Sequence, residues 1–416
     1  MNEQMLARQI EKYMKKLCVE LPHRHVGSSE NRIASAYFHD TIASYGFDTQ
    51  QQEFDCIDWK FGDVKLTVGD EQFVANAGPY SLPLDASAEM IVISTIHELE
   101  QAEIGGKIVL FLGDIASEQI MPKSFVFYNP EHHQKIIAIL EEKKPVGVIA
   151  ATGKNPELAG SWYPFPMFED GDFDIPNVFI KDVDGERLRI HNMKKIYLAF
   201  TSHRIPAKGY NIIARKGDFS QGKILITAHI DSKITSPGAL DNGTGVAVLL
   251  GLAELLQNYN GTPGIEIVPF NGEDYFSAPG QMSYLASCNN NFEDIRFVIN
   301  LHAAGYKNGN TAYSLYNQDA VMTDLINRTF STDNEFLEGE SWVQGDHSMF
   351  TMQGCPAIAI TSEKSRWLCS EITHTEMDNI TQVDITKLAR TTLKLHELVE
   401  EYSRKQKEPF EKYRKH

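Results

Sequence analysis

The chain is poor in cysteine, and its few cysteines fit no cysteine-based framework. Five occur in 416 residues, an odd number with no CxxC pair: Cys18, Cys56, Cys288, Cys355 and Cys369. A disulfide scaffold or a zinc site built from thiolates is therefore not expected. This scarcity predicts a reducing, cytoplasmic environment.

The sequence also lacks long apolar runs and an excess of basic residues. No stretch approaches the roughly 18 apolar residues of a membrane span. The first 22 residues follow a mixed-charge helical pattern without the apolar core of a signal peptide. The formal net charge of −17 argues against nucleic acid and anionic membranes as partners, because both are bound by basic surfaces.

The length of the chain and its changes in pattern predict more than one domain. Residues 61–205 contain short alternating runs separated by Gly, Pro and Asp turns, which predicts a β-rich module with no catalytic cluster. Its adjacent His132 and His133 lie in a charged helical segment and are expected to face solvent. Residues 206–405 alternate apolar strands with helices, which predicts a largely parallel sheet covered on both faces, completed by residues 1–60. The basic tail, residues 406–416, is expected to fray.

Residues able to bind metal follow several predicted strands in the second half of the chain. The strand 223–228 is followed directly by His229 and Asp231, and Asp241 precedes a helix. The carboxyl ends of parallel strands share one edge of a sheet, so these side chains are expected to converge. The complete set is His229, Asp231, Asp241, Glu273, Asp274, His302 and His374.

The chemistry of this set indicates a divalent metal site. Imidazole nitrogen and carboxylate oxygen without thiolate are the ligands of catalytic metal centres, zinc above all. Two metals need one shared carboxylate and separate terminal ligands, and the set supplies both. Each residue alone has a plainer explanation, such as a core histidine or a helix N-cap at Asp241. The "DNGTG" segment lacks the GxxxxGK[ST] spacing and the lysine of a phosphate loop.

The ordered motifs resemble the aminopeptidase Y-type zinc metallopeptidases. The runs are "NIIARKG", "TAHIDS", "GALDNGTG", "FNGEDYFSAPGQ", "VINLHAAG", "GDHSMFTMQGCPAIAI" and "HTEMDNITQVD". Residues 61–205 resemble the protease-associated domain that often interrupts this family. The resemblance implies a three-layer α/β/α fold with a mostly parallel mixed central sheet, interrupted by that β-rich insert.

The resemblance also implies roles for individual residues. It places two zinc ions in each chain, with Glu273 as the general base that takes a proton from the attacking water. It further implies a cis peptide between Asp241 and Asn242. The remaining roles are His229 on the first metal, Asp231 orienting that imidazole, Asp241 bridging, and Asp274 with His374 on the second metal.

The sequence departs from the family at two ligand positions. His302 stands where the family usually has an aspartate, and Asp274 stands where a second glutamate is common. The histidine leaves the identity and occupancy of the first metal open, and His302 is either a ligand or a pocket residue. Asp346 and His347 are expected to border the substrate or to form a structural turn, and Tyr275 to wall the pocket or to pack in the core.

These observations favour a metal-dependent aminopeptidase that acts on peptides with a free N-terminus. Three alternatives stay open. A glutaminyl cyclase would use one metal. A carboxypeptidase would want an arginine cluster, whereas the arginines are scattered. A non-catalytic binding protein would be expected to lack the base or several ligands, and these are present.

Overall fold

The computed structural model describes residues 1–125, 127–154, 163–289 and 291–407, and most of the expected basic tail lies outside them. The chain divides into two compact units. The first comprises Met1–Asp55, Lys208–Ser365 and Thr373–His416, and the second Cys56–Ala207 and Arg366–Ile372. The short segment 366–372 thus groups with the insert, which the sequence pattern did not indicate.

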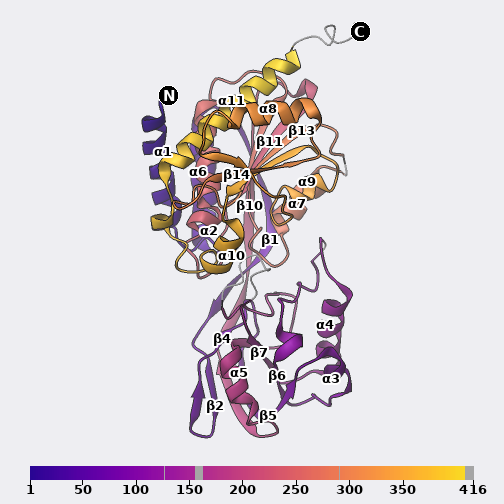
Figure 1. Cartoon of the computed structure of the whole chain (residues 1–416). Helices are drawn as coiled ribbons and strands as arrows, with labels where there is room; N and C mark the ends of the chain where they lie inside the picture. Colours follow the sequence, from indigo (N-terminus) through magenta and orange to yellow (C-terminus); the bar gives the residue numbers. More distant parts are fainter. Residues whose placement is uncertain (126, 155–162, 290, 408–416) are drawn as a thin grey trace. The chain divides into compact units, whose positions relative to one another are not determined.

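The first unit is built on an eight-stranded mixed sheet (Figure 1). Its four central strands, β12, β11, β13 and β16, are parallel, while β10 and β14 pair antiparallel to them. The order is β1 (Asp48–Phe61), β10 (Ser202–Lys216), β12 (Gly264–Phe270), β11 (Lys223–His229), β13 (Ile295–Leu301), β16 (Ala357–Ser362), β14 (Thr311–Tyr316) and β15 (Phe336–Glu338).

Helices cover this sheet on both faces, as expected from the alternating strand and helix pattern (Figure 1). One layer contains α1 (Glu3–Lys15), α2 (Ser29–Ser44), α6 (Thr244–Leu255) and α11 (Ile385–Lys407), with α8 (Ala320–Phe330) against α11. On the other side lie α7 (Pro279–Ser287) and the short α9 (Ser348–Thr351).

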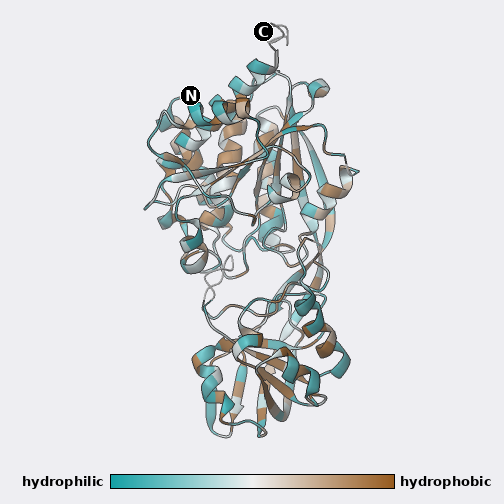
Figure 2. Cartoon of the chain, turned by 45° about the vertical axis from the view of Figure 1, so that its right-hand side comes forward, coloured by the Kyte–Doolittle hydropathy of each residue, from teal (hydrophilic) through white to brown (hydrophobic). Residues whose placement is uncertain are grey.

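The central strands form because most of their residues are apolar, and the charged Lys223 and Glu266 within them pair with each other. Every residue of β11, "KILITAH", and of β12, "GIEIVPF", is buried. Strands covered on both faces require such continuous runs. Figure 2 shows the brown hydrophobic residues concentrated in the strands and on the inner sides of the helices. The two buried strands end side by side, since His229 is in register with Phe270.

The second unit is also an α/β structure and contains a second eight-stranded sheet. Strands β5, β6, β7 and β8 are parallel, and β9 pairs antiparallel with β5. Its elements are β2 (Lys65–Val68), β3 (Glu71–Phe73), β4 (Asn76–Ala77), β5 (Leu84–Ile93), α3 (Ile96–Gln101), β6 (Ile108–Phe111), α4 (Glu131–Lys143), β7 (Gly147–Thr152), β8 (Asn177–Lys181), α5 (Asp182–Arg189) and β9 (Lys195–Phe200).

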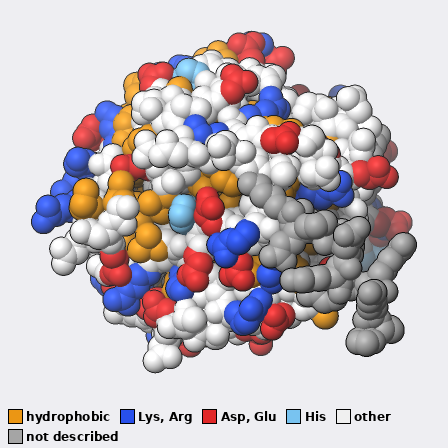
Figure 3. Space-filling view, turned by 90° about the horizontal axis from the view of Figure 1, so that it is seen from above, with side chains coloured by type: hydrophobic (Ala, Val, Ile, Leu, Met, Phe, Trp, Pro, Cys, Tyr) orange, Lys and Arg blue, Asp and Glu red, His pale blue; other side chains and the backbone are white. Residues whose placement is uncertain are grey.

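Among the described helices, none has the length and apolar character needed to cross a membrane. On the face of the molecule seen in Figure 3, Lys and Arg side chains lie interspersed with Asp and Glu side chains. This mixed distribution contrasts with the basic surfaces that bind nucleic acid.

Candidate metal centre

The histidines and carboxylates singled out from the sequence meet at the carboxyl ends of the central strands. His229 is the last residue of β11, and His302 directly follows β13. Glu273 and Asp274 lie in the loop after β12. His374 lies in the loop after α10 (Ser365–Glu371) and has a φ of +62°, a left-handed conformation that is uncommon for a non-glycine residue.

Asp241 is the centre of the cluster. His229 Nε2 lies 3.0 Å and His302 Nε2 lies 2.9 Å from the same oxygen, Oδ1. His374 Nε2 lies 2.9 Å from the other oxygen, Oδ2. Burial opposes the ionisation of Asp241, yet the neighbouring imidazoles hold its pKa well below its usual range. One carboxylate therefore faces imidazole nitrogens through both of its oxygens.

Asp274 completes the second half of the cluster. Its Oδ1 lies 3.0 Å from His374 Nε2, and its buried Oδ2 has no hydrogen-bond partner among the described residues. Burial would lower the pKa of His374, but the carboxylates of Asp274 and Asp241 outweigh it and raise that pKa to about 10.

Glu273 borders the first half of the cluster. Its Oε2 lies 3.8 Å from His229 Nε2, and its side chain is 20% exposed, whereas that of His229 is only 1% exposed. Burial raises the pKa of this carboxyl group, with further contributions from the charges of Asp274 and Asp241. Glu273 is thus accessible from the solvent side, where a substrate would approach.

Asp231 anchors the loop that carries the two acids. Its Oδ1 accepts hydrogen bonds from the backbone N–H groups of Gly272 and Glu273, and its Oδ2 accepts one from Asp274. His229 Nδ1 lies 3.2 Å from the Asp231 backbone carbonyl and 3.7 Å from its carboxylate. The closest link to the imidazole is therefore the carbonyl, and the carboxylate itself fixes Glu273 and Asp274.

A buried aspartate that the sequence interpretation did not single out supports the bridging residue. Asp378 accepts hydrogen bonds from the backbone N–H groups of Leu240 and Asp241. Burial, aided by the charge of Asp241, raises its pKa to about 7. The peptide bond between Asp241 and Asn242 is cis, as the resemblance implies, and the Asn242 side chain donates to the Leu301 carbonyl. The sequence signal that could have identified Asp378 is its position in the motif "HTEMDN", which also contains His374.

The remaining predicted residues surround the cluster without joining it. Asp346 accepts a hydrogen bond from Gln281, and burial together with the Glu273 charge raises its pKa to about 7. His347 uses both nitrogens elsewhere, accepting from the Asn300 amide and donating to the Trp342 carbonyl. Tyr275 is buried and packs against Phe276, with the two rings tilted by 36°.

The donor set fits divalent metal ions. Two ligand atoms on one tetrahedral zinc, with bonds of about 2.0–2.1 Å, lie roughly 3.3 Å apart. The imidazole–carboxylate separations of 2.9–3.0 Å around Asp241 and Asp274 are close to that value. The unpartnered, buried Asp274 Oδ2 adds a donor that hydrogen bonding leaves unused. The ligands would be His229 and His302 on one side of Asp241, and His374 and Asp274 on the other.

A second group of potential ligands lies in the other unit. Glu118 Oε1 is 2.7 Å from His132 Nε2 and 3.2 Å from His133 Nε2. His133 is buried, contrary to the expectation that both histidines face solvent. Its Nδ1 accepts the backbone N–H of Met121, so Nε2 carries the proton of the neutral ring and has no lone pair for a metal.

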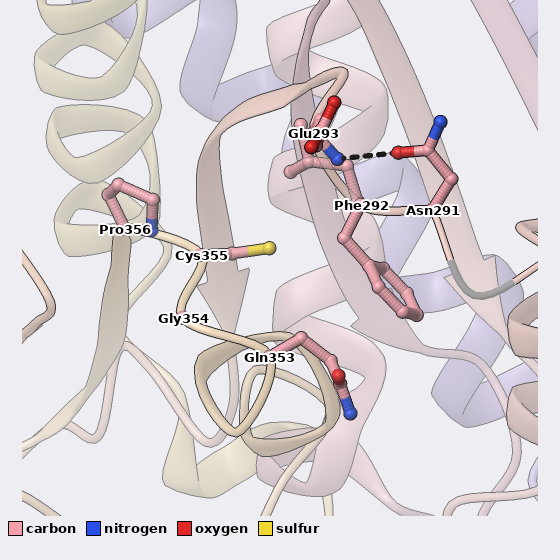
Figure 4. Close-up of a pocket in the computed structure, with 8 residues that line it drawn as sticks. Asn291, Phe292, Glu293, Gln353, Gly354, Cys355 and Pro356 are labelled. Carbon is pink, nitrogen blue, oxygen red and sulfur yellow. Dashed lines mark hydrogen bonds between the residues drawn. The ribbon is translucent and has the colours of Figure 1, made fainter.

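A pocket with a volume of about 570 Å³ lies at the opposite ends of the strands from the ligand cluster. It is lined by residues that precede β13 and β16, including Phe292, Gln353 and Cys355 (Figure 4). Asn291 Oδ1 there accepts a hydrogen bond from the Glu293 backbone. None of the described residues that line this pocket is a histidine, which separates it from the metal centre.

Comparison with known proteins agrees with this centre. Residues 211–399 match the model of Peptidase family M28, and every candidate ligand lies within that segment. The vacuolar membrane protease of Candida tropicalis is 25% identical over 222 residues, which are 50% of this chain and 22% of that protein. The chain therefore spans only about a fifth of the length of this curated relative.

Two solved aminopeptidases share the fold. The aminopeptidase from Aneurinibacillus sp. strain AM-1 superposes with a TM-score of 0.72 at 20% identity, covering 96% of this chain and 95% of that one. BSAP, a zinc aminopeptidase from Bacillus subtilis, gives 0.69 at 18% identity, covering 95% and 94%. The chain thus shares the mixed α/β fold and mostly parallel central sheet of these two structures.

Proposed function

We propose that this protein is a zinc-dependent aminopeptidase that binds two zinc ions and removes N-terminal residues from peptides with a free N-terminus. The convergence of three imidazoles on the two oxygens of Asp241, with Glu273 beside them, carries the proposal. The match to Peptidase family M28 and the two solved aminopeptidases support it.

The chain's own residues divide the work of hydrolysis. Bound zinc would polarise the scissile carbonyl and make water more acidic. Glu273 accepts the proton of the attacking water and passes it to the leaving amine, which requires a carboxylate within reach of both atoms. Asp231 holds that carboxylate in place through the loop backbone. The partial exposure of Glu273, His302 and His374 leaves a side open to the substrate.

Two of the three alternatives, the carboxypeptidase and the non-catalytic binding protein, find less support in the structure. A carboxypeptidase would need an arginine for the substrate carboxylate, but Arg215 pairs with Glu266 and Arg296 bonds the Gln221 carbonyl near the start of β13. Arg24 is buried and donates to the backbone carbonyls of Leu17, Ile230 and Gly238. A non-catalytic binding protein has no need for the complete ligand set with its base.

We extend the proposal to the insert and to location. The insert would be a protease-associated-like domain, and its mixed eight-stranded sheet is compatible with that interpretation. A cytoplasmic location remains a prediction, and the five cysteines, none of which is in a disulfide, are compatible with it.

A pair of peptides tests the proposed activity. One peptide carries a free N-terminus and its twin an acetylated one, and mass spectrometry identifies the products after incubation with the zinc-loaded protein. Stepwise loss of N-terminal residues from the free peptide alone is expected. Cleavage of both peptides would point to an endopeptidase, and cyclised glutamine without loss of residues would point to a cyclase.

A further inference from the structure

The two halves of the candidate centre differ in their donor atoms. On one side of Asp241 stand two imidazoles, those of His229 and His302. On the other side stand one imidazole and one carboxylate, from His374 and Asp274. The first set is therefore richer in nitrogen and carries one negative charge fewer than the second.

The His302 ring is held in position to take part. Its Nε2 shares Asp241 Oδ1 with His229 Nε2, and the two rings are nearly perpendicular, at 87° with centroids 5.0 Å apart. The centroid of the Trp342 ring lies 5.6 Å from that of the His302 ring. A Cβ at Gly345 would come within 2.8 Å of the Trp342 ring and 3.3 Å of His302 Nδ1, so this glycine allows the close packing.

Donor type decides which divalent ions a position favours. Imidazole suits zinc and its neighbours in the transition series, whereas carboxylate oxygen also suits harder ions such as Mn²⁺. The nitrogen-rich position is therefore expected to take the first equivalent of Zn²⁺, whereas Mn²⁺ favours the position whose ligands carry more negative charge.

We propose that the two metal positions are chemically unequal, with the His229–His302–Asp241 position selecting Zn²⁺ and the Asp241–Asp274–His374 position also accepting Mn²⁺. This inference rests on the proposed two-metal centre. In this proposal His302 is a metal ligand, and its imidazole is the reason that the two positions differ in metal affinity.

The test is metal binding to the full-length metal-free protein, which needs no activity measurement. Isothermal titration with Zn²⁺ should show two steps whose affinities differ by at least ~10-fold. Protein given one equivalent of Zn²⁺ and then excess Mn²⁺ should bind one Mn²⁺ per chain, counted by electron paramagnetic resonance and elemental analysis.

Two reciprocal variants sharpen the test. His302→Asp removes the extra imidazole, so the two Zn²⁺ affinities should converge and Mn²⁺ should enter both positions of the metal-free protein. Asp274→His makes the second position rich in nitrogen, so Mn²⁺ binding there should fall ~10-fold or more. His97→Gln, at a histidine whose side chain is 81% exposed in the insert, is the control and should change neither result.

The outcomes separate this inference from the proposed function. Two equal Zn²⁺ steps in the wild type, or unequal steps that persist in His302→Asp, would overturn the inequality while leaving the aminopeptidase proposal intact. No tight metal binding in the wild type would overturn both. If His302→Asp fails to fold, the loss of Mn²⁺ binding expected in Asp274→His still tests the proposal.

Discussion

Two histidine–carboxylate clusters of this molecule look alike by spacing and differ in chemistry. In the first unit, three imidazoles turn Nε2 towards the carboxylates of Asp241 and Asp274. In the insert, two imidazoles turn Nε2 towards Glu118. The second cluster fails as a metal site because a backbone N–H occupies His133 Nδ1 and leaves the proton on Nε2. The far nitrogen of a histidine therefore decides whether the near one can bind metal.

The largest effect is expected from removing the proposed general base of the first cluster. This variant separates catalysis from metal binding. Glu273→Gln should lower turnover by ~10²–10⁴-fold, because the amide cannot accept the water proton. Zinc content should stay unchanged, since Glu273 is assigned to the base and not to the ligands. Steady-state kinetics and elemental analysis measure the two quantities.

The matched control is Glu293→Gln, an exposed glutamate near the Figure 4 pocket, which should retain full activity. Loss of zinc from Glu273→Gln together with activity would show instead that this residue is a ligand.

The second comparison concerns the anchor of the acidic loop. The two carboxylate oxygens of Asp231 together accept three backbone N–H groups. Asp231→Asn replaces one of these oxygens with an NH2 group, whose hydrogens then face a backbone N–H donor. We expect zinc affinity to fall ~10–100-fold, the usual effect of losing support behind a ligand. Competition with a chelator measures this affinity. Asp40→Asn, at a side chain that is 82% exposed, is the control. Equal affinities in the two variants would argue against the anchoring role.

The third comparison uses pH. In the metal-free protein the carboxylates raise the pKa of His374 to about 10, and the pKa values of His229 and His302 are also raised. At pH 7 a metal ion must therefore displace protons, so binding should strengthen as the pH rises towards 10. Titration in buffers of different ionisation enthalpy counts the released protons. Identical binding heats in phosphate and Tris would contradict this prediction.

The smallest effect is expected in the insert. His132→Ala removes the exposed imidazole beside Glu118, and we expect zinc per chain to remain at the wild-type value. Loss of one tightly held ion would show that the His133 ring reorients to free its Nε2, and the distinction between the two clusters would fail.

The sequence predicts the centre of the main sheet well because its central strands are mostly apolar. The continuous runs of β11 and β12 indicated parallel strands, and their common edge predicted that His229 and Glu273 would meet. The contacts of Asp231 and Asp378 could not be predicted, because both act through backbone N–H groups of loops distant in sequence. His133 was placed wrongly because adjacent histidines give no helical periodicity that separates a buried face from an exposed one.

The central claim is that one carboxylate, Asp241, joins two metal ions. The most direct measurement is zinc per chain by elemental mass spectrometry, for the wild type and for Asp241→Ala, after loading with dilute zinc and dialysis into metal-free buffer. We expect about two ions in the wild type and loss of both in the variant, because the other ligand atoms are grouped around this residue. A wild type without tightly held zinc, or a variant that keeps both ions, would contradict it.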